Sequence, residues 1–186
     1  MKNFLPLLLL SATAASAHVL VGDGSFELGA NGHMWLPAST NFGQPFCYVG
    51  VHCGTVPRTG VQWIVLGDAG VYAEAASVQQ TAEILIGEKI LEFYVWWSSS
   101  VVNPPDPAAV FNVKVDGHLL FTLTPATAAA YSSAYTRIAI DVSDYANGIN
   151  HTLRFEWYNA AASAPSILNL DDVRIVDNGI FAHGFQ

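Results

Sequence analysis

An acidic pair near the C-terminus is the feature of this sequence most suggestive of chemistry. Asp171 and Asp172 interrupt residues 168–176, LNLDDVRIV, which otherwise have the composition of a buried strand. Carboxylates in such a strand cost several kcal/mol unless they are paired, hydrogen bonded or bound to a metal ion. Because side chains alternate along a strand, we expect Asp171 and Asp172 to point in opposite directions.

Two further stretches, residues 90–97 (ILEFYVWW) and 150–159 (NHTLRFEWYN), alternate apolar with polar or aromatic residues. This period of two predicts strands with one apolar face and one outward face. The outward residues are Glu92, Tyr94 and Trp96 on the first strand and Arg154, Glu156 and Tyr158 on the second. Aromatic rings stack on sugar rings while charged groups bind hydroxyls, so these faces predict a glycan-binding surface. The alternative is that the aromatic residues pack beneath the proline-rich loop at 98–109.

The N-terminus has the pattern of a secretory signal peptide. Lys2 precedes an apolar run at residues 4–10, and small residues follow up to Ala17. We therefore expect a signal peptide at residues 1–17 and one domain at residues 18–186, secreted to the extracellular space. The apolar run is too short to span a bilayer, and no later run is long enough.

Charge excludes several kinds of partner. The chain of 186 residues has 7 Lys and Arg against 15 Asp and Glu, a formal net charge of −8. So few basic residues form no basic patch, so we expect no binding of nucleic acid or of anionic membrane surfaces. Removal of Lys2 with the leader makes the mature chain one unit more negative.

The two cysteines, Cys47 and Cys53, lie close together in FCYVGVHCG. In an oxidising compartment this spacing predicts a local disulfide. His52 lies between them, but no nearby residues complete a tetrahedral zinc site. The sequon at Asn150, Asn-His-Thr, predicts N-glycosylation in a eukaryotic host.

Short strands separated by turns run through the rest of the chain. We expect them within residues 19–29, 60–67, 73–84, 90–97, 111–117, 118–123, 135–143, 150–159 and 168–176, with a loop at 30–60. An Asp-Gly turn joins residues 111–117 to 118–123 as a hairpin. Eight or nine short strands without heptads or repeats predict an all-β fold, an antiparallel β-sandwich of the jelly-roll type.

The ordered motifs resemble the galactose-binding-like jelly rolls, which include many carbohydrate-binding modules of secreted proteins. The matching pieces are GDGSFE, FCYVGVHCG, GVQWIVLG, ILEFYVWW, FNVKVDGHLLF and HTLRFEWYN followed by LNLDDVRI. They cover nearly the whole mature chain and imply the fold. They do not imply one ligand, because this fold supports several functions.

The resemblance also implies two sites. Members of this family often hold a structural calcium between a Glu of the first strand and an Asp of the last, which correspond here to Glu27 and Asp171. The alternative is that Asp171 binds backbone amides and Glu27 is solvated. The resemblance further implies that the strands bearing Trp96 and Tyr158 are neighbours on a concave, glycan-binding sheet.

An N-terminal histidine after leader cleavage suggests a different chemistry. Copper-dependent polysaccharide monooxygenases bind one copper ion through such a residue, here His18, and a second histidine. The candidates for the second ligand are His33, His52, His118, His151 and His183. No G-x-S-x-G, H-E-x-x-H or phosphate-loop motif accompanies them.

The function expected from the sequence is non-catalytic carbohydrate binding by a secreted protein. The aromatic rim loop with Trp35 and Tyr48 is the second place to look for the site. Two alternatives remain: a structural or matrix protein that self-associates, and the copper enzyme using His18. The first has support from the high apolar content of a lone domain, 52%.

Overall fold

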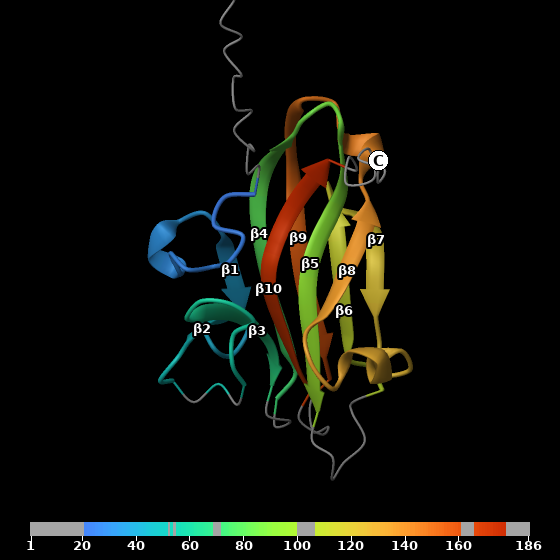
Figure 1. Cartoon of the computed structure of the whole chain (residues 1–186). Coiled ribbons are helices and arrows are strands. Elements are labelled where there is room, and N and C mark those ends of the chain that lie inside the picture. The colour runs from blue at the N-terminus through green and yellow to red at the C-terminus, as the bar shows by residue number, and fades with distance from the viewer. Residues whose placement is uncertain are drawn as a thin grey trace, which may run out of the picture.

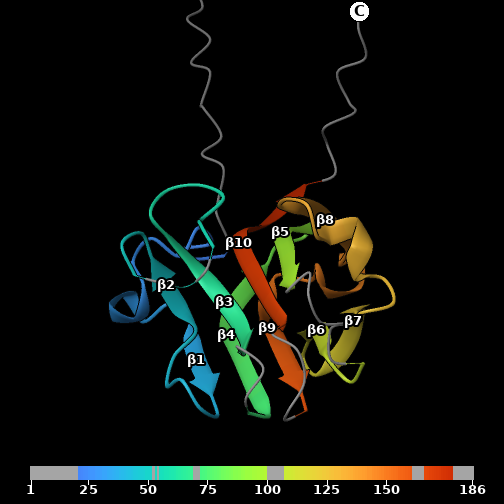
Figure 2. The same cartoon turned by 90° about the horizontal axis from the view of Figure 1, so that it is seen from below.

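The computed structural model describes residues 21–51, 53, 55–68, 72–99, 107–160 and 166–177. They form two five-stranded sheets packed face to face, as Figures 1 and 2 show from the front and from below. Sheet A has the order β1 (Leu36–Ser39), β4 (Glu74–Ile84), β9 (Ile149–Asn159), β6 (Val110–Val115), β7 (His118–Leu123). Sheet B has the order β2 (Phe46–Tyr48), β3 (Gln62–Asp68), β10 (Ser166–Asp177), β5 (Glu88–Ser99), β8 (Thr136–Asp141). All these pairings are antiparallel, which confirms the predicted sandwich.

The core lies between the two sheets and is built from the apolar positions of the alternating strands. Phe93 of β5 meets Phe111 of β6 and Phe155 of β9 with ring centroids 5.1–6.4 Å apart. Trp97 packs against Trp157 across the sandwich at 4.8 Å. Each such ring is almost fully buried and contributes roughly 1.5–3 kcal/mol by leaving water. The predicted inward residues of β5 and β9 are thereby confirmed.

The N-terminal region differs from the prediction in two ways. Residues 21–29, expected as strand, form turns, with Asp23 and Phe26 at positive φ of 48° and 60°. The expected loop at 30–60 instead contains β1 and β2 and the short 3-10 helix η1 (Ala30–Gly32). Such strands of four and three residues are too short to show a period of two in the sequence.

Strand β10 contains a bulge that changes the direction of the acidic pair. Its register with β5 shifts between Asp171 and Arg174, and Asp172 has a positive φ of 51°. Both Asp171 and Asp172 therefore bind the same loop, through Arg58 and Thr59. The expectation that their side chains point in opposite directions is wrong, because a bulge breaks the alternation.

Two other short 3-10 helices, η2 (Ala128–Tyr131) and η3 (Ser143–Tyr145), connect strands at the ends of the sandwich. The described residues include no helix with the length and apolar character needed to cross a bilayer. The predicted leader at residues 1–17 lies outside the described residues.

Candidate functional site

The six residues predicted to form one glycan surface do not lie together. Strand β5 belongs to sheet B and β9 to sheet A, so their outward side chains lie on opposite sides of the sandwich. Glu92, Tyr94 and Trp96 therefore cannot share a ligand with the outward residues of β9. The neighbouring strands that the resemblance implied are wrong for this chain. The alternation in the sequence could not correct this, because it assigns the face of each strand and does not identify the sheet that contains it.

The outward residues of β9 form one wall of a hollow on sheet A. Register places Tyr158 between Ala75 of β4 and Val110 of β6, and Glu156 between Ser77 and Asn112. Small side chains on β1 and β4 leave a hollow of about 270 Å³ beside the larger residues of β9 and β6. Its lining includes Ala38, Ala75, Ser77, Asn112, Arg154, Glu156 and Tyr158. The Tyr158 ring, 49% exposed, is the aromatic surface of this hollow.

A polar network that includes Arg154 and Glu156 of the lining extends to one side of the same hollow. Glu156 accepts a hydrogen bond of 2.9 Å from Arg154 Nε and forms an ion pair with Lys114 Nζ at 2.5 Å. Arg154 Nη1 also donates to Gln79 Oε1 at 2.8 Å. Burial opposes ionisation of Glu156, but the hydrogen bonds from Lys114 and Arg154 outweigh it and lower its pKa. The hollow thus offers fixed donors and a charged acceptor to a polar ligand.

The outward residues of β5 are instead parts of a packed cluster. Glu92, 1% exposed, binds Arg137 of β8 and Arg174 of β10 through both carboxylate oxygens. Their hydrogen bonds outweigh the effect of burial and lower the pKa of Glu92. The guanidinium of Arg58 lies 3.5 Å from the centre of the Tyr94 ring and covers it.

Trp96 belongs to this same packed surface. Its ring packs edge-on against Tyr135 at 5.9 Å, and its Nε1 donates to the carbonyl of Ser132 at 3.0 Å. Tyr135 in turn donates to the carbonyl of Val56, and burial raises the pKa of its phenol. Trp96 and Tyr94 are therefore packed, but their covers are the Ser132–Tyr135 segment and the Arg58 side chain. The loop at 98–109, expected to cover them, lies partly outside the described residues.

Glu27 and Asp171, the predicted calcium ligands, both bind the backbone of the segment before β3. Glu27 accepts N–H groups of Val61 and Gln62 at 2.9–3.2 Å. Asp171 accepts those of Arg58 and Thr59 at 2.8 and 3.2 Å, and that of Asp172 at 2.8 Å. Each of the four carboxylate oxygens thus accepts an amide N–H.

These contacts are those of amide capping: backbone N–H groups bind the carboxylate oxygens that a calcium ion would need among its six to eight oxygen ligands. The described side chains include no group of three or more His, Cys, Asp or Glu that could hold a metal ion. Burial raises the pKa of Asp171 to about 7, and the neighbouring Asp172 adds to the effect. Calcium at Glu27 and Asp171 stays a prediction.

The histidines considered for copper binding are only partly described. His18, His52 and His183 lie outside the described residues, so the copper site also stays a prediction. His151 is buried between Asp116 Oδ2, 2.7 Å from Nδ1, and Asn147 Oδ1, 3.0 Å from Nε2. Both of its ring nitrogens are therefore engaged in linking turns at one end of the sandwich.

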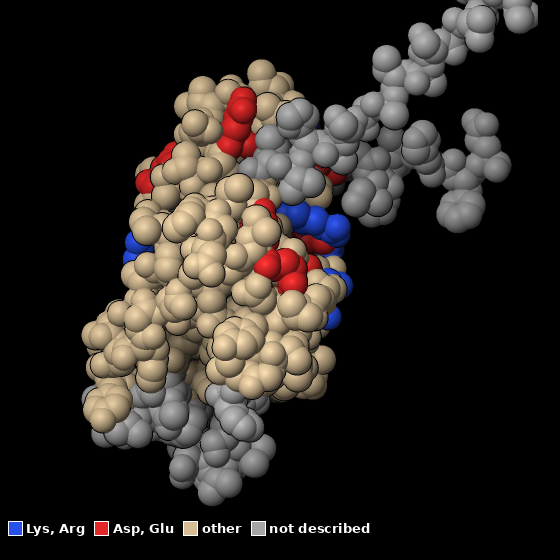
Figure 3. All heavy atoms as spheres, turned by 90° about the vertical axis from the view of Figure 1, so that its left-hand side faces the viewer, with Lys and Arg blue, Asp and Glu red and all other residues tan. Residues whose placement is uncertain are grey.

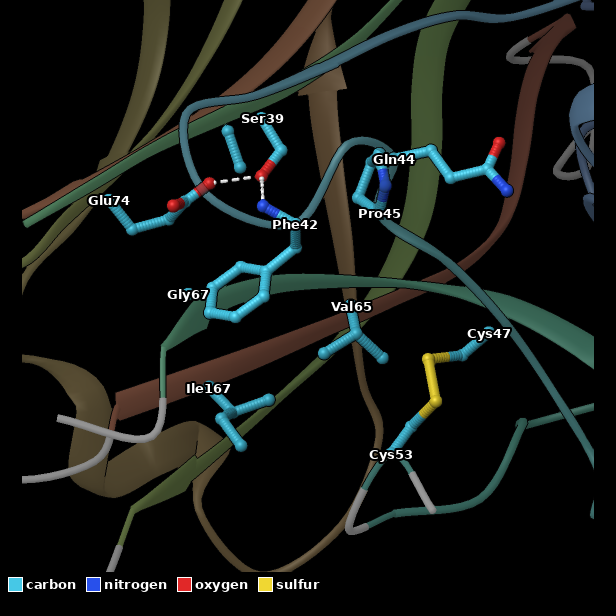
Figure 4. Close-up of a pocket in the computed structure, with 11 residues that line it drawn as sticks. Ser39, Phe42, Gln44, Pro45, Cys47, Cys53, Val65, Gly67, Glu74 and Ile167 are labelled. Carbon is cyan, nitrogen blue, oxygen red and sulfur yellow. Dashed lines mark hydrogen bonds between the residues drawn. A yellow bond between two sulfur atoms is a disulfide. The ribbon is translucent and has the colours of Figure 1, made fainter. Parts of the chain in front are cut away.

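The predicted Cys47–Cys53 disulfide is present and borders a second cavity (Figure 4). This cavity of about 230 Å³ lies between the edge strands β1 and β2, with Phe42, Val65 and Ile167 pointing into it. The buried Glu74 carboxylate at its end accepts hydrogen bonds from Ser39, Thr40 and Asn41. Its predominantly apolar lining offers few partners for sugar hydroxyls.

Several residues that line the sheet A hollow, and Lys114, which pairs with Glu156 beside it, were absent from the prediction. Asn112 and Lys114 alternate with valines in FNVKV, so their outward direction was readable from the sequence. Ala38, Ala75 and Ser77 could not be predicted from the sequence, because they contribute to the hollow only by having small side chains. Trp35, named as a rim candidate, is 2% exposed and packs against Phe26 and Phe155 in the core. Tyr48, the other rim candidate, is 55% exposed, so of the two rim aromatics it is the one that a ligand could reach.

Comparison with known proteins supports the fold. No family model and no curated protein matches this sequence. A family 61 carbohydrate-binding module, solved in complex with β-1,4-galactotriose, is similar with a TM-score of 0.57 and 10% identity, covering 87% of this chain and 100% of that one. A structure described for carbohydrate-binding modules of the β-sandwich superfamily is similar with a TM-score of 0.51 and 10% identity, covering 83% and 61%. The predicted resemblance to carbohydrate-binding-module jelly rolls is confirmed at the level of fold.

Proposed function

We propose that this chain is a secreted, non-catalytic carbohydrate-binding protein that holds a glycan in the sheet A hollow. The observation that carries the proposal is the half-exposed Tyr158 ring beside the network of Arg154, Glu156 and Lys114. An aromatic face for a sugar ring, next to directional hydrogen-bonding groups, is the usual composition of such a site. The similarity of the fold to carbohydrate-binding modules supports the same class of function.

The charges in the hollow favour binding over hydrolysis. Glycoside hydrolysis generally uses two carboxyl groups, one of them protonated at working pH. Among the described residues that line the hollow, Glu156 is the single carboxylate, and its two cationic partners keep it ionised. It is therefore suited to accept hydrogen bonds from hydroxyls rather than to donate a proton.

The test is affinity electrophoresis of the purified mature protein in gels containing soluble β-linked polysaccharides, including β-1,4-galactan. We expect micromolar to millimolar affinity, about −4 to −8 kcal/mol, because the hollow is open to water. Tyr158→Ala should reduce retardation at least about tenfold, and Glu156→Gln should also weaken it. Ile149→Ala, which truncates a similarly exposed side chain at the opposite end of β9, is the matched control.

The outcome is read together with thermal melting of each variant. If the Tyr158→Ala variant is folded and its retardation in the gel is unchanged, the hollow is not the binding site. Release of shorter sugars from the polysaccharide would contradict a non-catalytic function, and copper-dependent oxidation of the glycan would favour the enzyme using His18.

A further inference from the structure

The N-terminal part of the domain exposes large apolar side chains and almost no charge. From residue 28 to residue 67, Arg58 is the single Lys, Arg, Asp or Glu. Nine of the fourteen exposed large hydrophobic residues among the described residues fall in this range. Figure 3 views the molecule from the side of β1 and β2, and uncharged surface covers most of that side.

Six of these residues define what we call the edge face. They come from the turn before η1, the loop before β2, strand β2, the segment after it and the residue before β3. Their side chains are 43–58% exposed: Leu28, Phe42, Tyr48, Val49, Val51 and Val61.

Backbone contacts hold most of the edge face together. Val49 donates to the carbonyl of Val61 at 2.8 Å, and Val51 donates to that of Tyr48 at 3.1 Å. Val61 also donates to the carboxylate of Glu27, which adjoins Leu28. The apolar cavity bordered by Phe42 and the disulfide opens between β1 and β2, the edge strands of the two sheets.

We propose that the edge face is an interface between two copies of this chain. At about half exposure, the two aromatic side chains offer on the order of 100 Å² of surface each and the four aliphatic side chains somewhat less, on the order of 500 Å² together. A standard interface buries about 800 Å² per partner, of which a little over half is apolar. The edge face therefore has the apolar area that a stable dimer needs.

Charge is consistent with a second copy of this chain as the partner. Two chains with a formal net charge of −8 repel each other, and this repulsion is weakest where the contacting surfaces carry no charge. The carboxylate of Glu27 at the border already accepts two backbone N–H groups. The uncharged face is thus the side through which two acidic copies approach with least repulsion.

Contact in this dimer is through side chains rather than through a continuous sheet. Strand β2 has three residues, and β1 has four including Pro37, so neither presents a long edge for strand pairing. The 230 Å³ cavity has room for an apolar side chain of the partner copy. Most of the sheet A hollow lies on other strands, so dimerisation leaves that hollow accessible.

Sedimentation velocity of the mature protein from about 1 µM to about 1 mM tests the proposal. We expect a reversible monomer–dimer equilibrium that strengthens as salt screens the repulsion between acidic copies. Val49→Glu introduces a charge in the edge face and should raise the dissociation constant at least about tenfold. Ile86→Glu is the matched control, because Ile86 is 83% exposed on the turn before β5.

Three results would overturn the proposal. The first is a wild-type protein that stays monomeric over the whole range. The second is equal weakening by Val49→Glu and Ile86→Glu in variants with unchanged melting temperature. The third is a wild-type protein that remains monomeric but adsorbs to apolar particles, with Val49→Glu abolishing the adsorption. This result would assign the edge face to another kind of partner.

Discussion

Asp171 should contribute less to stability at neutral pH than at mildly acidic pH, in contrast to most carboxylates, because it loses its buried proton as the pH rises. Its pKa rises from 3.8 to about 7, because burial disfavours the charged form and Asp172 lies beside it. The folded state therefore binds this proton more tightly than the unfolded chain. The stabilisation is fully present below pH 3.8 and is lost as the pH rises through 7.

The magnitude follows from the size of the pKa difference. At about 1.4 kcal/mol per pH unit, the shift amounts to about 4 kcal/mol between the two ends of this range. Other carboxylates act in the opposite direction, because the pKa of Glu92, of Asp116 and of Glu156 is lowered in the folded state. The total pH dependence of stability therefore mixes both signs.

A comparison of wild type with the Asp171→Asn variant isolates the contribution of Asp171 to the pH dependence of stability. The amide has a similar shape and does not titrate, while the other carboxylates are the same in both proteins. Urea unfolding of each protein between pH 4 and pH 8, in the presence of a chelator, gives the two free energies of unfolding. Relative to the variant, wild type should lose about 4 kcal/mol from pH 4 to pH 8.

A constant difference across this range would refute the reasoning, and so would a gain by wild type as the pH rises. The same experiment with calcium in place of the chelator tests the predicted metal site. Calcium bound by Glu27 and Asp171 would favour the ionised carboxylate, raise the melting temperature and reverse the sign of the difference. An identical result with calcium and with chelator would contradict the calcium prediction.

Three further substitutions test features of the fold. Trp96→Ala should lower the free energy of unfolding by about 1–3 kcal/mol and leave glycan retardation unchanged, because the ring packs on sheet B; lost binding in a folded variant would contradict this. Replacing Cys47 and Cys53 by Ser should cost roughly 2 kcal/mol, and the native protein should weigh about 2 Da less than its reduced form; two reactive thiols in native protein would exclude the bridge. Gly24→Ala should destabilise by about 1–3 kcal/mol in a thermal melt, because the added Cβ would lie 1.8 Å from the carbonyl oxygen of Val173; an unchanged melting temperature would count against this contact.

The sequence predicted the strands well wherever alternation ran for six residues or more. Strands β5 and β9 have the predicted inward residues, and the Asp-Gly turn forms the β6–β7 hairpin. Strands β1 and β2 escaped detection because three or four residues carry no measurable period. The turns at 21–29 depend on tertiary contacts such as the bond from Val173 N to the Gly24 carbonyl, which no local pattern encodes.

The site was predicted only in part, for a physical reason. Alternation identified Arg154, Glu156 and Tyr158 as outward, and they line the hollow on sheet A. The same argument identified Tyr94 and Trp96 as outward, but it contains no information about the sheet or about segments that cover a face. The Arg58 guanidinium over Tyr94 comes from a loop more than thirty residues away in the sequence.

The central position of β10 determines when this domain can fold during synthesis. The pairs β2–β3 and β5–β8 have no hydrogen-bonded connection until the last strand lies between β3 and β5. Sheet A likewise cannot be completed before β9 has been synthesised, because β9 joins β4 to β6. Sheet B therefore stays incomplete in a nascent chain until β10 has been synthesised, because the contacts that join its strands are distant in the sequence. In a chain exported as predicted, this strand order makes the last strand the one that joins the two halves of sheet B.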